Sequence, residues 1–278
     1  MKGEPLARRI REEVRAKVAR IRSTTSTTPC LATVLVGNAP SSTVYVRAKR
    51  KGCESVGIKS LAIELPGDTT TEQAILAVDQ LSNDGAVHGI LIQHPVPRSV
   101  DRRALFERVP PAKDVDAITS VSLGRSILGM PSFSACTPQG IVRLLQEYGV
   151  PLEGADAVVI GRSPILGRPL ASMLINAHAT VTLCHSHTRN LADMVRRADV
   201  VIAAVGRPRF VQGEWIKPGA VVVDAGYNEG CVGDVDFEAA LPRASWITPV
   251  PGGVGPMTLA ILLEQSAEAA AQQLGVAP

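Results

Sequence analysis

The chain has 278 residues, of which 45% are hydrophobic and 20% are charged, and its formal net charge is +3. At roughly 150 residues per domain this length predicts two domains, and the apolar content excludes bulk disorder. The nearly balanced charge and the low aromatic content, 3%, argue against a nucleic-acid-binding protein, which typically has a basic stripe with stacking aromatic residues.

Cysteine placement and apolar run lengths indicate the compartment. The five cysteines are far apart and form no CxxC pair, so we expect neither a disulfide scaffold nor a structural zinc site. No apolar run approaches the ~18 residues that span a bilayer, and the N-terminus lacks the apolar segment of a signal peptide. These features predict a cytoplasmic protein that binds no membrane.

The first half of the chain alternates between helical and strand patterns. Apolar residues recur at steps of four and three from Leu6 to Ile21, which predicts an amphipathic helix, and 23–29 is a polar connector. The elements expected next are a strand at 31–37, a helix at 41–56, a strand at 59–64, a helix at 71–83 and a strand at 89–93. Such alternation is typical of βαβ units with a parallel sheet.

The second half resumes this alternation after an irregular stretch. Residues 95–138 are rich in Pro, Ser and Asp, so we expect loops and short helices there. Beyond this stretch the sequence predicts helices at 138–148, 167–177, 189–197 and 256–274, and strands at 157–160, 180–183, 200–203 and 220–224. The expected fold class is therefore α/β, with two α/β domains.

A glycine-containing turn in the second half suits a dinucleotide. Residues 155–167 read ADAVVIGRSPILG, a buried strand that ends at Gly161 and is followed by a turn and a helix. Such a turn points free backbone N–H groups at whatever lies above the strand. The spacing G-x-S-x-x-x-G departs from G-x-G-x-x-G, and a purely structural turn explains it equally well.

The end of the next strand bears on which dinucleotide would bind. NAD-selective sites usually have an acidic residue about 20 residues further on, which binds the ribose 2′-hydroxyl. Residues 184–188 read CHSHT and contain no carboxylate, and Arg162 lies in the first turn, so NADP is favoured over NAD. We expect His185 and His187 to point apart at the end of the strand, which argues against a metal site.

Tyr45 and Lys49 are spaced i, i+4 in a predicted helix and share one face. They belong either to a solvated basic surface or to a phenol–amine pair for proton transfer. The pattern YxxxK also marks short-chain dehydrogenases, where it follows the dinucleotide turn. Here it precedes Gly161 by more than 110 residues, so that family is disfavoured.

Polar residues at the end of a strand and in a later loop are further candidates. Gln93 lies just past the strand at 89–93, where open α/β sheets bind ligands. We expect Asp114 and Asp116 to place two carboxylates on one side of an extended segment, where a carboxylate can accept two N–H bonds from an aminopyrimidine. A turn or a cap explains each of these residues equally well.

Together these motifs resemble one family, the bifunctional methylenetetrahydrofolate dehydrogenase/cyclohydrolases. The resemblance covers nearly the whole chain, in the same order throughout. Its most specific segment is TPVPGGVGPMTLAILL at 248–263. The other matching segments are 41–58, 90–97, 111–119, 135–145, 158–174, 179–188 and 213–228.

The resemblance implies an NADP-dependent enzyme of one-carbon metabolism and purine biosynthesis. It would oxidise 5,10-methylenetetrahydrofolate and hydrolyse the methenyl product to 10-formyltetrahydrofolate. Residues 1–137 with 257–278 would form an N-terminal catalytic three-layer domain that binds folate, and 138–256 a C-terminal Rossmann-like domain that binds NADP, with a cleft between them. Its partners would be tetrahydrofolate one-carbon derivatives and a second copy of the chain, in a homodimer, and not nucleic acid.

The same resemblance assigns roles in folate chemistry by position. Lys49 would be the general acid/base for attack of water on the methenyl carbon. Tyr45 would stack on the folate, and Gln93 would hydrogen-bond the lysine. Asp116, with Asp114 behind it, would hold the amino-pyrimidine side of the pterin.

The remaining assigned residues would border the cleft or bind the cofactor. Pro251, Gly252 and Gly253 would border the cleft. The cofactor residues would be Gly161, Arg162, Ser163, Ser186, Tyr227 and Thr258. No metal is implied, because the methenyl group is already electrophilic and needs only positioning and one proton-transfer group.

Several positions depart from the family pattern. They include His94 in place of the leucine of QLP, Ala117 for the glycine of DVDG, Tyr227 for the small residue of GIN, and His187 for the basic residue of HSKT. The first three leave open a dehydrogenase-only or substrate-shifted paralogue, and His187 weakens the case for tight NADP preference. A folate- or nucleotide-binding protein without turnover is a third alternative, against which Lys49 and Gln93 argue.

Overall fold

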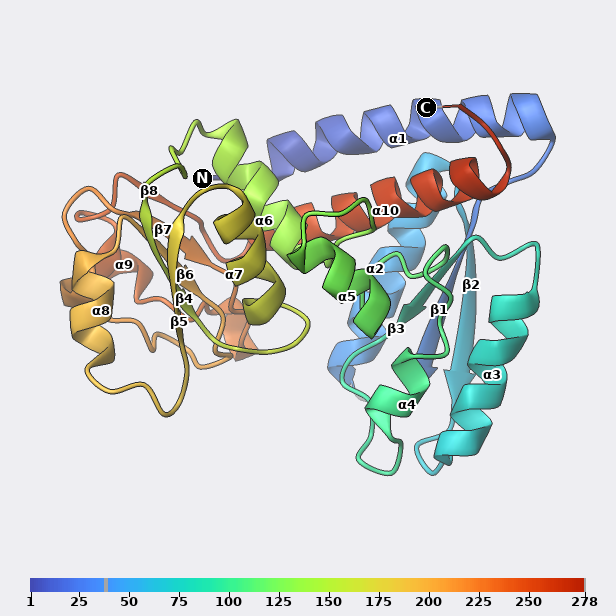
Figure 1. The fold of residues 1–278 in the computed structure, drawn as a ribbon, viewed down its shortest axis with the longest axis horizontal. Coiled ribbons are helices and arrows are strands. Elements are labelled where there is room, and N and C mark those ends of the chain that lie inside the picture. The colour runs from blue at the N-terminus through green and yellow to red at the C-terminus, as the bar shows by residue number, and fades with distance from the viewer. Residues whose placement is uncertain (38–39, 278) are drawn as a thin grey trace. The chain divides into compact units, whose positions relative to one another are not determined.

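The computed structural model describes residues 1–37 and 40–277, and the side chains of residues 40–45 lie outside that description. The chain forms two compact units, whose elements are labelled in Figure 1. Unit 1 consists of Met1–Arg8, Arg125–Pro131 and Ala135–Ile261, and unit 2 of Arg9–Gly124, Ser132–Ser134 and Leu262–Pro278. Three helices contribute residues to both units, namely α1 (Glu4–Thr25), α5 (Ser120–Ile127) and α10 (Val254–Gln273).

Unit 2 is built on a three-stranded parallel sheet. Its strands are β1 (Cys30–Val36), β2 (Lys59–Leu65) and β3 (Gly89–Ile92), in the order β2-β1-β3. α2 (Pro40–Val56) connects β1 to β2, and α3 (Thr71–Asn83) leads back from β2 to β3, so right-handed crossovers place these helices on opposite faces. The predicted βαβ order is confirmed, with each bound within one residue of its prediction.

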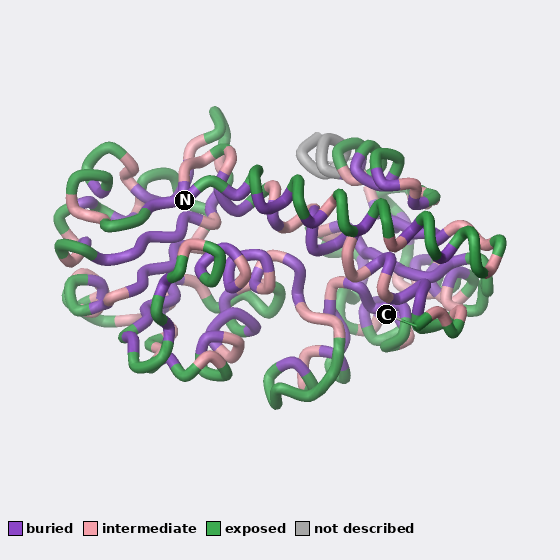
Figure 2. Tube along the Cα trace, turned by 90° about the horizontal axis from the view of Figure 1, so that it is seen from above, coloured by how far each residue is buried: buried purple, intermediate pink, exposed green. Residues whose placement is uncertain are grey.

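The core of unit 2 fixes the ends of its central strands. Apolar side chains of β1, β3 and α3 pack with Leu105 and Phe106 of α4 (Arg102–Phe106) in one cluster. β1 and β3 are buried along their whole length. Figure 2 shows buried residues in purple along the Cα trace. Residues that directly follow these strands, such as Gln93, therefore start from a rigid backbone.

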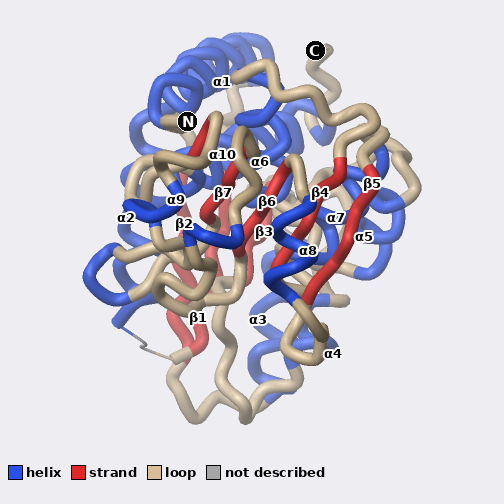
Figure 3. The backbone as a smooth tube through the Cα atoms, turned by 90° about the vertical axis from the view of Figure 1, so that its left-hand side faces the viewer, coloured by secondary structure: helices blue, strands red, loops and turns tan. Residues whose placement is uncertain are grey.

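Unit 1 contains a five-stranded parallel sheet, whose strands are red in Figure 3. Its strands are β4 (Asp156–Ile160), β5 (Thr180–Cys184), β6 (Val200–Ala203), β7 (Val221–Asp224) and β8 (Trp246–Ile247), in the order β5-β4-β6-β7-β8. α6 (Cys136–Glu147) precedes β4, α7 (Gly167–Asn176) leads to β5, and α8 (Leu191–Arg197) leads back to β6. The strand order therefore reverses between β4 and β6, which makes their carboxyl ends a topological switch point.

The sequence missed some short elements and placed several helix ends two or three residues away from their observed positions, namely the starts of α6, α8 and α10 and the end of α1. β8 has two residues and α9 (Phe237–Ala240) has four, too few for a hydrophobic period to be visible. α1 continues through the first residues of the predicted connector to Thr25, whose hydroxyl donates to the carbonyl oxygen of Ile21 at 2.8 Å. A threonine bonded in this way to the preceding turn is compatible with a helix.

Two further features of the described residues concern helix length and the cysteines. Among the residues described, no helix has both the length and the apolar character that crossing a membrane requires. All five cysteines are free thiols, and four of them are buried.

Lys113 closes the C-terminal end of α3. Its buried ammonium donates to the carbonyl oxygens of Leu81, Ser82 and Asp84 at 3.2, 2.9 and 2.8 Å. Carbonyl groups at a helix C-terminus lack intrahelical donors, and a cation is favoured at this negative end of the helix dipole. Burial lowers the pKa of Lys113. The side chain therefore has a structural role beside the segment that carries Asp114 and Asp116.

Replacing Lys113 with methionine should destabilise unit 2. Methionine keeps most of the side-chain volume but removes the donor from three carbonyl groups, and leaving a buried polar group unsatisfied costs about 1–3 kcal/mol. Urea unfolding followed by circular dichroism should show a lower midpoint for Lys113→Met than for the parent. Lys59→Met, at an exposed lysine, is the control, and an unchanged midpoint for Lys113→Met would contradict the assigned role.

Candidate functional site

The turn after β4 approaches its neighbours too closely for any residue but glycine. Gly161 has a φ of +123°, and a Cβ there would lie 2.1 Å from the carbonyl oxygen of Ala204, which follows β6. A Cβ on Gly167, the first residue of α7, would lie 1.8 Å from the carbonyl oxygen of Gly161. The two glycines therefore allow the backbone to pack tightly at the switch point, where open α/β sheets bind ligands.

A cavity of about 290 Å³ opens beside this turn. Three residues predicted for the cofactor line it together, namely Gly161, Arg162 and Ser186. Sequence reasoning missed the rest of its lining, which includes His185, Leu191, Val205, Arg207 and Phe210. The residues after β6 belong to no local sequence motif that would indicate a cofactor site. They lie next to the turn after β4 because β4 and β6 are neighbours in the sheet.

The polar lining of this cavity suits an anion. Arg162 and Arg207 are exposed, and neither forms an ion pair with a carboxylate within residues 1–37 and 40–277. Desolvation, followed by the charges of Arg162 and His187, lowers the pKa of His185. The cavity thus offers guanidinium groups, a hydroxyl group and an imidazole whose neutral form is favoured.

The expectation that His185 and His187 point apart is wrong, since even in a strand the side chains at i and i+2 share one face. β5 ends at Cys184, and the following residues form a turn in which the N–H of Thr188 donates to the carbonyl oxygen of His185 at 2.9 Å. This turn brings the two imidazole rings edge to face, with centroids 6.0 Å apart. Within the described part of the chain, no group of three His, Cys, Asp or Glu side chains is placed to hold a metal ion.

A buried carboxylate fixes the loop after β6. Asp234 Oδ2 accepts hydrogen bonds from the N–H groups of Val205 and Gly206 at 2.6 and 2.9 Å. Its Oδ1 accepts from the N–H of Arg207 at 2.9 Å and from Nδ2 of Asn228 at 3.0 Å. One side chain therefore holds a wall of the cavity and the segment that contains Tyr227.

Asp224, at the end of β7, holds Asp234 in turn. Its Oδ1 accepts from the N–H groups of Gly226 and Asp234, both at 2.9 Å, and its Oδ2 accepts from Val235 at 2.9 Å. Burial, and then the nearby charge of Asp234, raises the pKa of Asp224, while the three N–H donors oppose that rise. A Cβ on Gly233 would lie 1.9 Å from Asp224 Oδ2, so this pair leaves no space for a side chain there.

Three predicted cofactor residues of unit 1 do not line the cavity. Ser163 Oγ accepts from the N–H of Leu166 at 3.1 Å, and so stabilises the turn before α7. Tyr227 is 56% exposed, and its hydroxyl lies 3.2 Å from Cys231 Sγ. Thr258 donates to Thr137 Oγ1 at 3.0 Å, which connects α10 to α6.

Residues 251–253 also belong to unit 1. Gly252 has a φ of +100°, and its carbonyl oxygen accepts from the N–H of Gly3 at 2.9 Å. A Cβ on Gly253 would lie 2.6 Å from the carbonyl oxygen of Pro249. Pro251 is exposed. The two glycines thus serve a tight backbone turn before α10.

In unit 2, the predicted contact between Lys49 and Gln93 is present. Lys49 Nζ, on α2, donates to Gln93 Oε1 at 2.7 Å. Gln93 is buried, and its Nε2 donates to the carbonyl oxygen of His94 at 2.7 Å, which orients the amide with its oxygen toward the lysine. The backbone of Tyr45 lies in α2, but its side chain is outside the described residues, so its predicted stacking stays a prediction.

His94 adds an imidazole next to this pair. Its ring packs edge to face on Phe106, with centroids 5.0 Å apart. Its Nε2 is buried and has no hydrogen-bond partner among the described residues. The pKa of His94 is lowered, mainly by burial. The charges of Lys49 and Arg102 also lower it, whereas the charge of Asp116 raises it. The neutral form of this histidine, whose ring packs on Phe106, is therefore favoured.

The segment that carries Asp114 and Asp116 is not extended, contrary to expectation. It consists of consecutive turns, in which the N–H of Lys113 donates to the carbonyl oxygen of Pro110 at 2.8 Å. The N–H of Ala117 donates to the carbonyl oxygen of Asp114 at 3.2 Å, and Ala117 has a φ of +49°. The two carboxylates consequently have different surroundings, with Asp114 buried and Asp116 half-buried.

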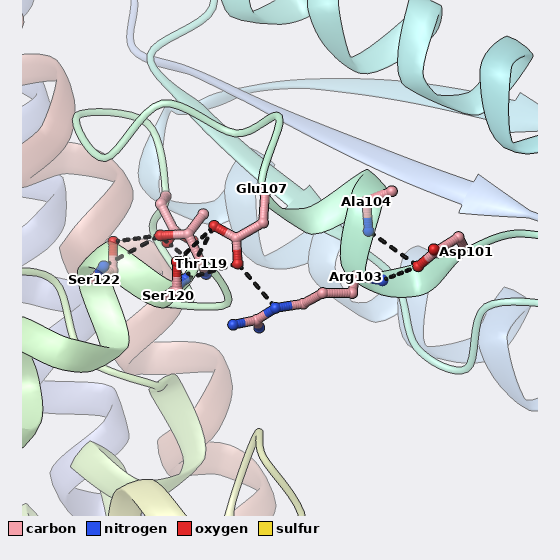
Figure 4. Close-up of polar contacts among 8 residues, drawn as sticks. Asp101, Arg103, Ala104, Glu107, Thr119, Ser120 and Ser122 are labelled. Atoms are coloured by element: carbon pink, nitrogen blue, oxygen red, sulfur yellow. Dashed lines mark hydrogen bonds and ion pairs between the residues drawn. The ribbon is translucent and has the colours of Figure 1, made fainter.

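Asp114 is committed to the loop itself. Its carboxylate accepts from the N–H of Ile118 at 3.0 Å and from the N–H and the hydroxyl of Thr119 at 3.1 and 2.8 Å. Burial raises its pKa, while these hydrogen bonds act to lower it. Figure 4 shows the adjoining contact, in which the Glu107 carboxylate accepts from the N–H and the hydroxyl of Ser120 at the start of α5. Asp114 thus fixes the turn that displays Asp116.

Both parts of the chain match known families. Residues 1–116 match the family described as "Tetrahydrofolate dehydrogenase/cyclohydrolase, catalytic domain". Residues 135–274 match "Tetrahydrofolate dehydrogenase/cyclohydrolase, NAD(P)-binding domain".

Whole-chain relatives are similar over nearly their full length. "Bifunctional protein FolD 1" of Streptomyces avermitilis is 59% identical over 276 residues, which is 99% of this chain and 96% of the relative. The crystal structure of FolD methylenetetrahydrofolate dehydrogenase/cyclohydrolase from Campylobacter jejuni has a TM-score of 0.95 at 42% identity, covering 98% of each chain. The Trypanosoma brucei methylenetetrahydrofolate dehydrogenase-cyclohydrolase, solved with NADP and an inhibitor, has a TM-score of 0.94 at 36% identity, covering 98% of this chain and 97% of its own.

Replacing Gly161 with alanine should weaken dinucleotide binding. The new Cβ would overlap the carbonyl oxygen of Ala204, so the turn would have to move away from the cavity, and we expect at least a tenfold rise in the Kd for NADP, about 1.4 kcal/mol. Calorimetric titration measures this change. Gly219→Ala is the matched control, because Gly219 also has positive φ but nothing lies within 4 Å of its Cβ position. Equal affinities for the two variants would refute the steric argument.

Proposed function

The chain belongs to the tetrahydrofolate dehydrogenase/cyclohydrolase family, and from this premise we propose which of its residues carry the two reactions. It is a bifunctional enzyme that oxidises 5,10-methylenetetrahydrofolate with NADP and hydrolyses 5,10-methenyltetrahydrofolate to 10-formyltetrahydrofolate. The observation that best supports both activities in one chain is the 2.7 Å hydrogen bond between Lys49 and Gln93 in unit 2, in a chain whose unit 1 also carries an intact dinucleotide turn.

NADP would bind at the switch point of unit 1. The backbone around Gly161 would face the pyrophosphate, and Arg162 and Ser186 would bind the 2′-phosphate in the cavity beside it. Ser163 would support this turn, and Tyr227 and Thr258 would lie near the nicotinamide. NADP would supply the hydride acceptor, and unit 1 would hold its nicotinamide in a fixed orientation.

Lys49 would move the protons of the hydrolytic step. As water attacks the methenyl carbon, the neutral amine takes a proton from it, and a proton is then delivered to N5 as the carbon–N5 bond breaks. The second proton of the water leaves as the formyl carbonyl forms. Gln93 would hold the amine at the reacting carbon through its Oε1, and Tyr45 would stack on the folate.

The pterin would be held by a carboxylate on a rigid turn. Asp116 would accept the amino-pyrimidine N–H groups, and the buried Asp114 would act through the loop by fixing its turns. Pro251, Gly252 and Gly253 would border the substrate. Residues 1–137 with 257–278 would make up the folate-binding domain and 138–256 the NADP-binding domain.

The cellular context follows from the same chemistry. We propose that the enzyme is a cytoplasmic homodimer, and that its 10-formyltetrahydrofolate supplies purine biosynthesis. The net charge of +3 and the 3% aromatic content support a protein that acts on small molecules and not on nucleic acid.

The alternative, a dehydrogenase with impaired hydrolysis, is less well supported. The observations in its favour are His94, Ala117 and Tyr227, which replace residues usual in the family. None of these replacements displaces the Lys49–Gln93 hydrogen bond. The hydrogen bond between the residues proposed for proton transfer therefore supports the bifunctional assignment.

An absorbance time course with purified enzyme, methylenetetrahydrofolate and NADP tests the bifunctional assignment. We expect NADPH to form with little build-up of methenyltetrahydrofolate, because hydrolysis consumes the product of the first step. A parallel reaction with NAD should be slower. Accumulation of the methenyl compound would mean that hydrolysis is uncoupled, and the absence of any reduced nucleotide would contradict dehydrogenase activity.

Lys49→Met should remove cyclohydrolase turnover. The variant loses the proton-transfer group, and loss of such a group typically lowers a rate by 10²–10⁴-fold. Hydrolysis of added methenyltetrahydrofolate measures this rate, and NADP affinity should stay at the parent value because the dinucleotide turn lies in unit 1. Lys51→Met, at an exposed lysine of the same helix, is the control. Hydrolysis at the parent rate in Lys49→Met would refute the role of this lysine.

A further inference from the structure

The loop after β6 forms one wall of the 290 Å³ cavity. None of the residues proposed above to bind NADP belongs to this loop. Ala204, Val205, Arg207 and Phe210 of this loop line the same cavity as Arg162. Arg207 therefore places a second guanidinium at the site proposed for the 2′-phosphate.

The Arg207 guanidinium is oriented by an aromatic ring. Its Cζ lies 4.7 Å from the centroid of Phe210, and such stacking leaves the N–H groups at the edge of the guanidinium plane available. Phe210 is itself fixed, because it packs edge to face on Trp215 with centroids 6.2 Å apart. In the described residues no carboxylate pairs with Arg207, so its hydrogen-bonding capacity remains for a ligand.

The backbone under Arg207 is equally constrained. The N–H groups of Val205, Gly206 and Arg207 all donate to the buried Asp234 carboxylate, at 2.6 to 2.9 Å. An arginine on a fixed backbone and stacked on a fixed ring loses little conformational freedom when it binds an anion. The side chain is thus organised for binding before a ligand arrives.

We propose that Arg207 is a specificity-determining residue for NADP, which binds the 2′-phosphate together with Arg162 and Ser186. This inference rests on the proposed placement of NADP in unit 1. A phosphate monoester carries close to two negative charges at neutral pH, and two guanidinium groups with a hydroxyl match that charge and its acceptor oxygens. Arg207 would thereby supply the positive charge that the family usually has at the position of His187.

A contact with the adenine is the rival role for Arg207. The stacked guanidinium also has a flat face, and aromatic bases stack on such faces. NAD and NADP share the adenine and differ only in the 2′-phosphate. A stacking role therefore predicts equal losses for the two nucleotides, whereas phosphate binding predicts a loss for NADP alone.

The test compares Arg207→Ala and Arg207→Lys with the parent enzyme. Dehydrogenase kcat and KM are measured with NADP and with NAD, and the Kd values of adenosine 2′,5′-bisphosphate and adenosine 5′-monophosphate are measured by calorimetry. Arg209→Ala is the control, because Arg209 is an exposed arginine of the same loop that does not line the cavity. Arg207 is at the surface, so these variants leave the core intact.

We expect Arg207→Ala to raise the KM for NADP and the Kd of the bisphosphate about tenfold, the effect of losing one charge-assisted contact. The kcat, the KM for NAD and the Kd of the monophosphate should change less than about twofold. Arg207→Lys should show a smaller rise, because it keeps the charge and loses the planar geometry. Arg209→Ala should behave like the parent.

Two results would overturn this proposal. Equal losses for NADP and NAD would assign Arg207 to the adenine, and unchanged constants would remove it from the site. Failure of the proposed function has a different signature, since the parent would then reduce neither nucleotide with methylenetetrahydrofolate. The calorimetric comparison of bisphosphate with monophosphate would still decide the role of Arg207 in that case.

Discussion

Asp234 is a buried carboxylate that accepts four hydrogen bonds, and through them it fixes both the loop after β6 and the segment of Asn228. A buried charge without donors costs several kcal/mol, so the loop after β6 and Asn228 are held to it by electrostatics as well as by packing. Asp224 lies behind it and accepts three further N–H groups. The wall of the nucleotide cavity and the segment of Tyr227 therefore form one connected structure, and neither can move without breaking hydrogen bonds of the other.

Unit 2 uses the same device for a different ligand. Asp114 is buried, and its carboxylate oxygens accept hydrogen bonds from Ile118 and Thr119 of the same loop. Asp116, two residues later, is half-buried. Gln93 is also buried and has both ends of its amide occupied, by Lys49 and by the carbonyl oxygen of His94. In each case a buried polar group with its hydrogen bonds satisfied positions a neighbouring side chain for which we propose a role in the reaction. Preorganisation of this kind lowers the entropy cost of placing the reacting groups.

A feature of the fold or of the candidate site could be predicted from the sequence where nearby residues determine it. The βαβ order and the turn at Gly161 were predictable, because hydrophobic periods and glycine spacing are local. The turns around Asp114 were not, because hydrogen bonds to its side chain set their backbone. The closeness of His185 and His187 was predictable in principle, because residues i and i+2 of a strand share a face. No sequence pattern indicated a functional or structural role for Asp234 or Arg207. Their importance comes from contacts 27 to 29 residues apart in the chain, which the order of strands in the sheet creates.

The departures from the family pattern can be explained by what each position tolerates. His94 replaces an apolar residue, and its ring packs on Phe106 as an apolar side chain would, at the cost of an unpartnered Nε2. Ala117 replaces a glycine at a φ of +49°, a strain of about 1 kcal/mol that its buried methyl group and the bond to Asp114 offset. Tyr227 projects into solvent beside Cys231. Each replacement is thus accommodated locally and leaves the Lys49–Gln93 pair unchanged. His187 differs from these three because it replaces a residue that is basic in the family pattern, so a positive charge is lost. Local packing cannot restore that charge, but another cation that lines the cavity can.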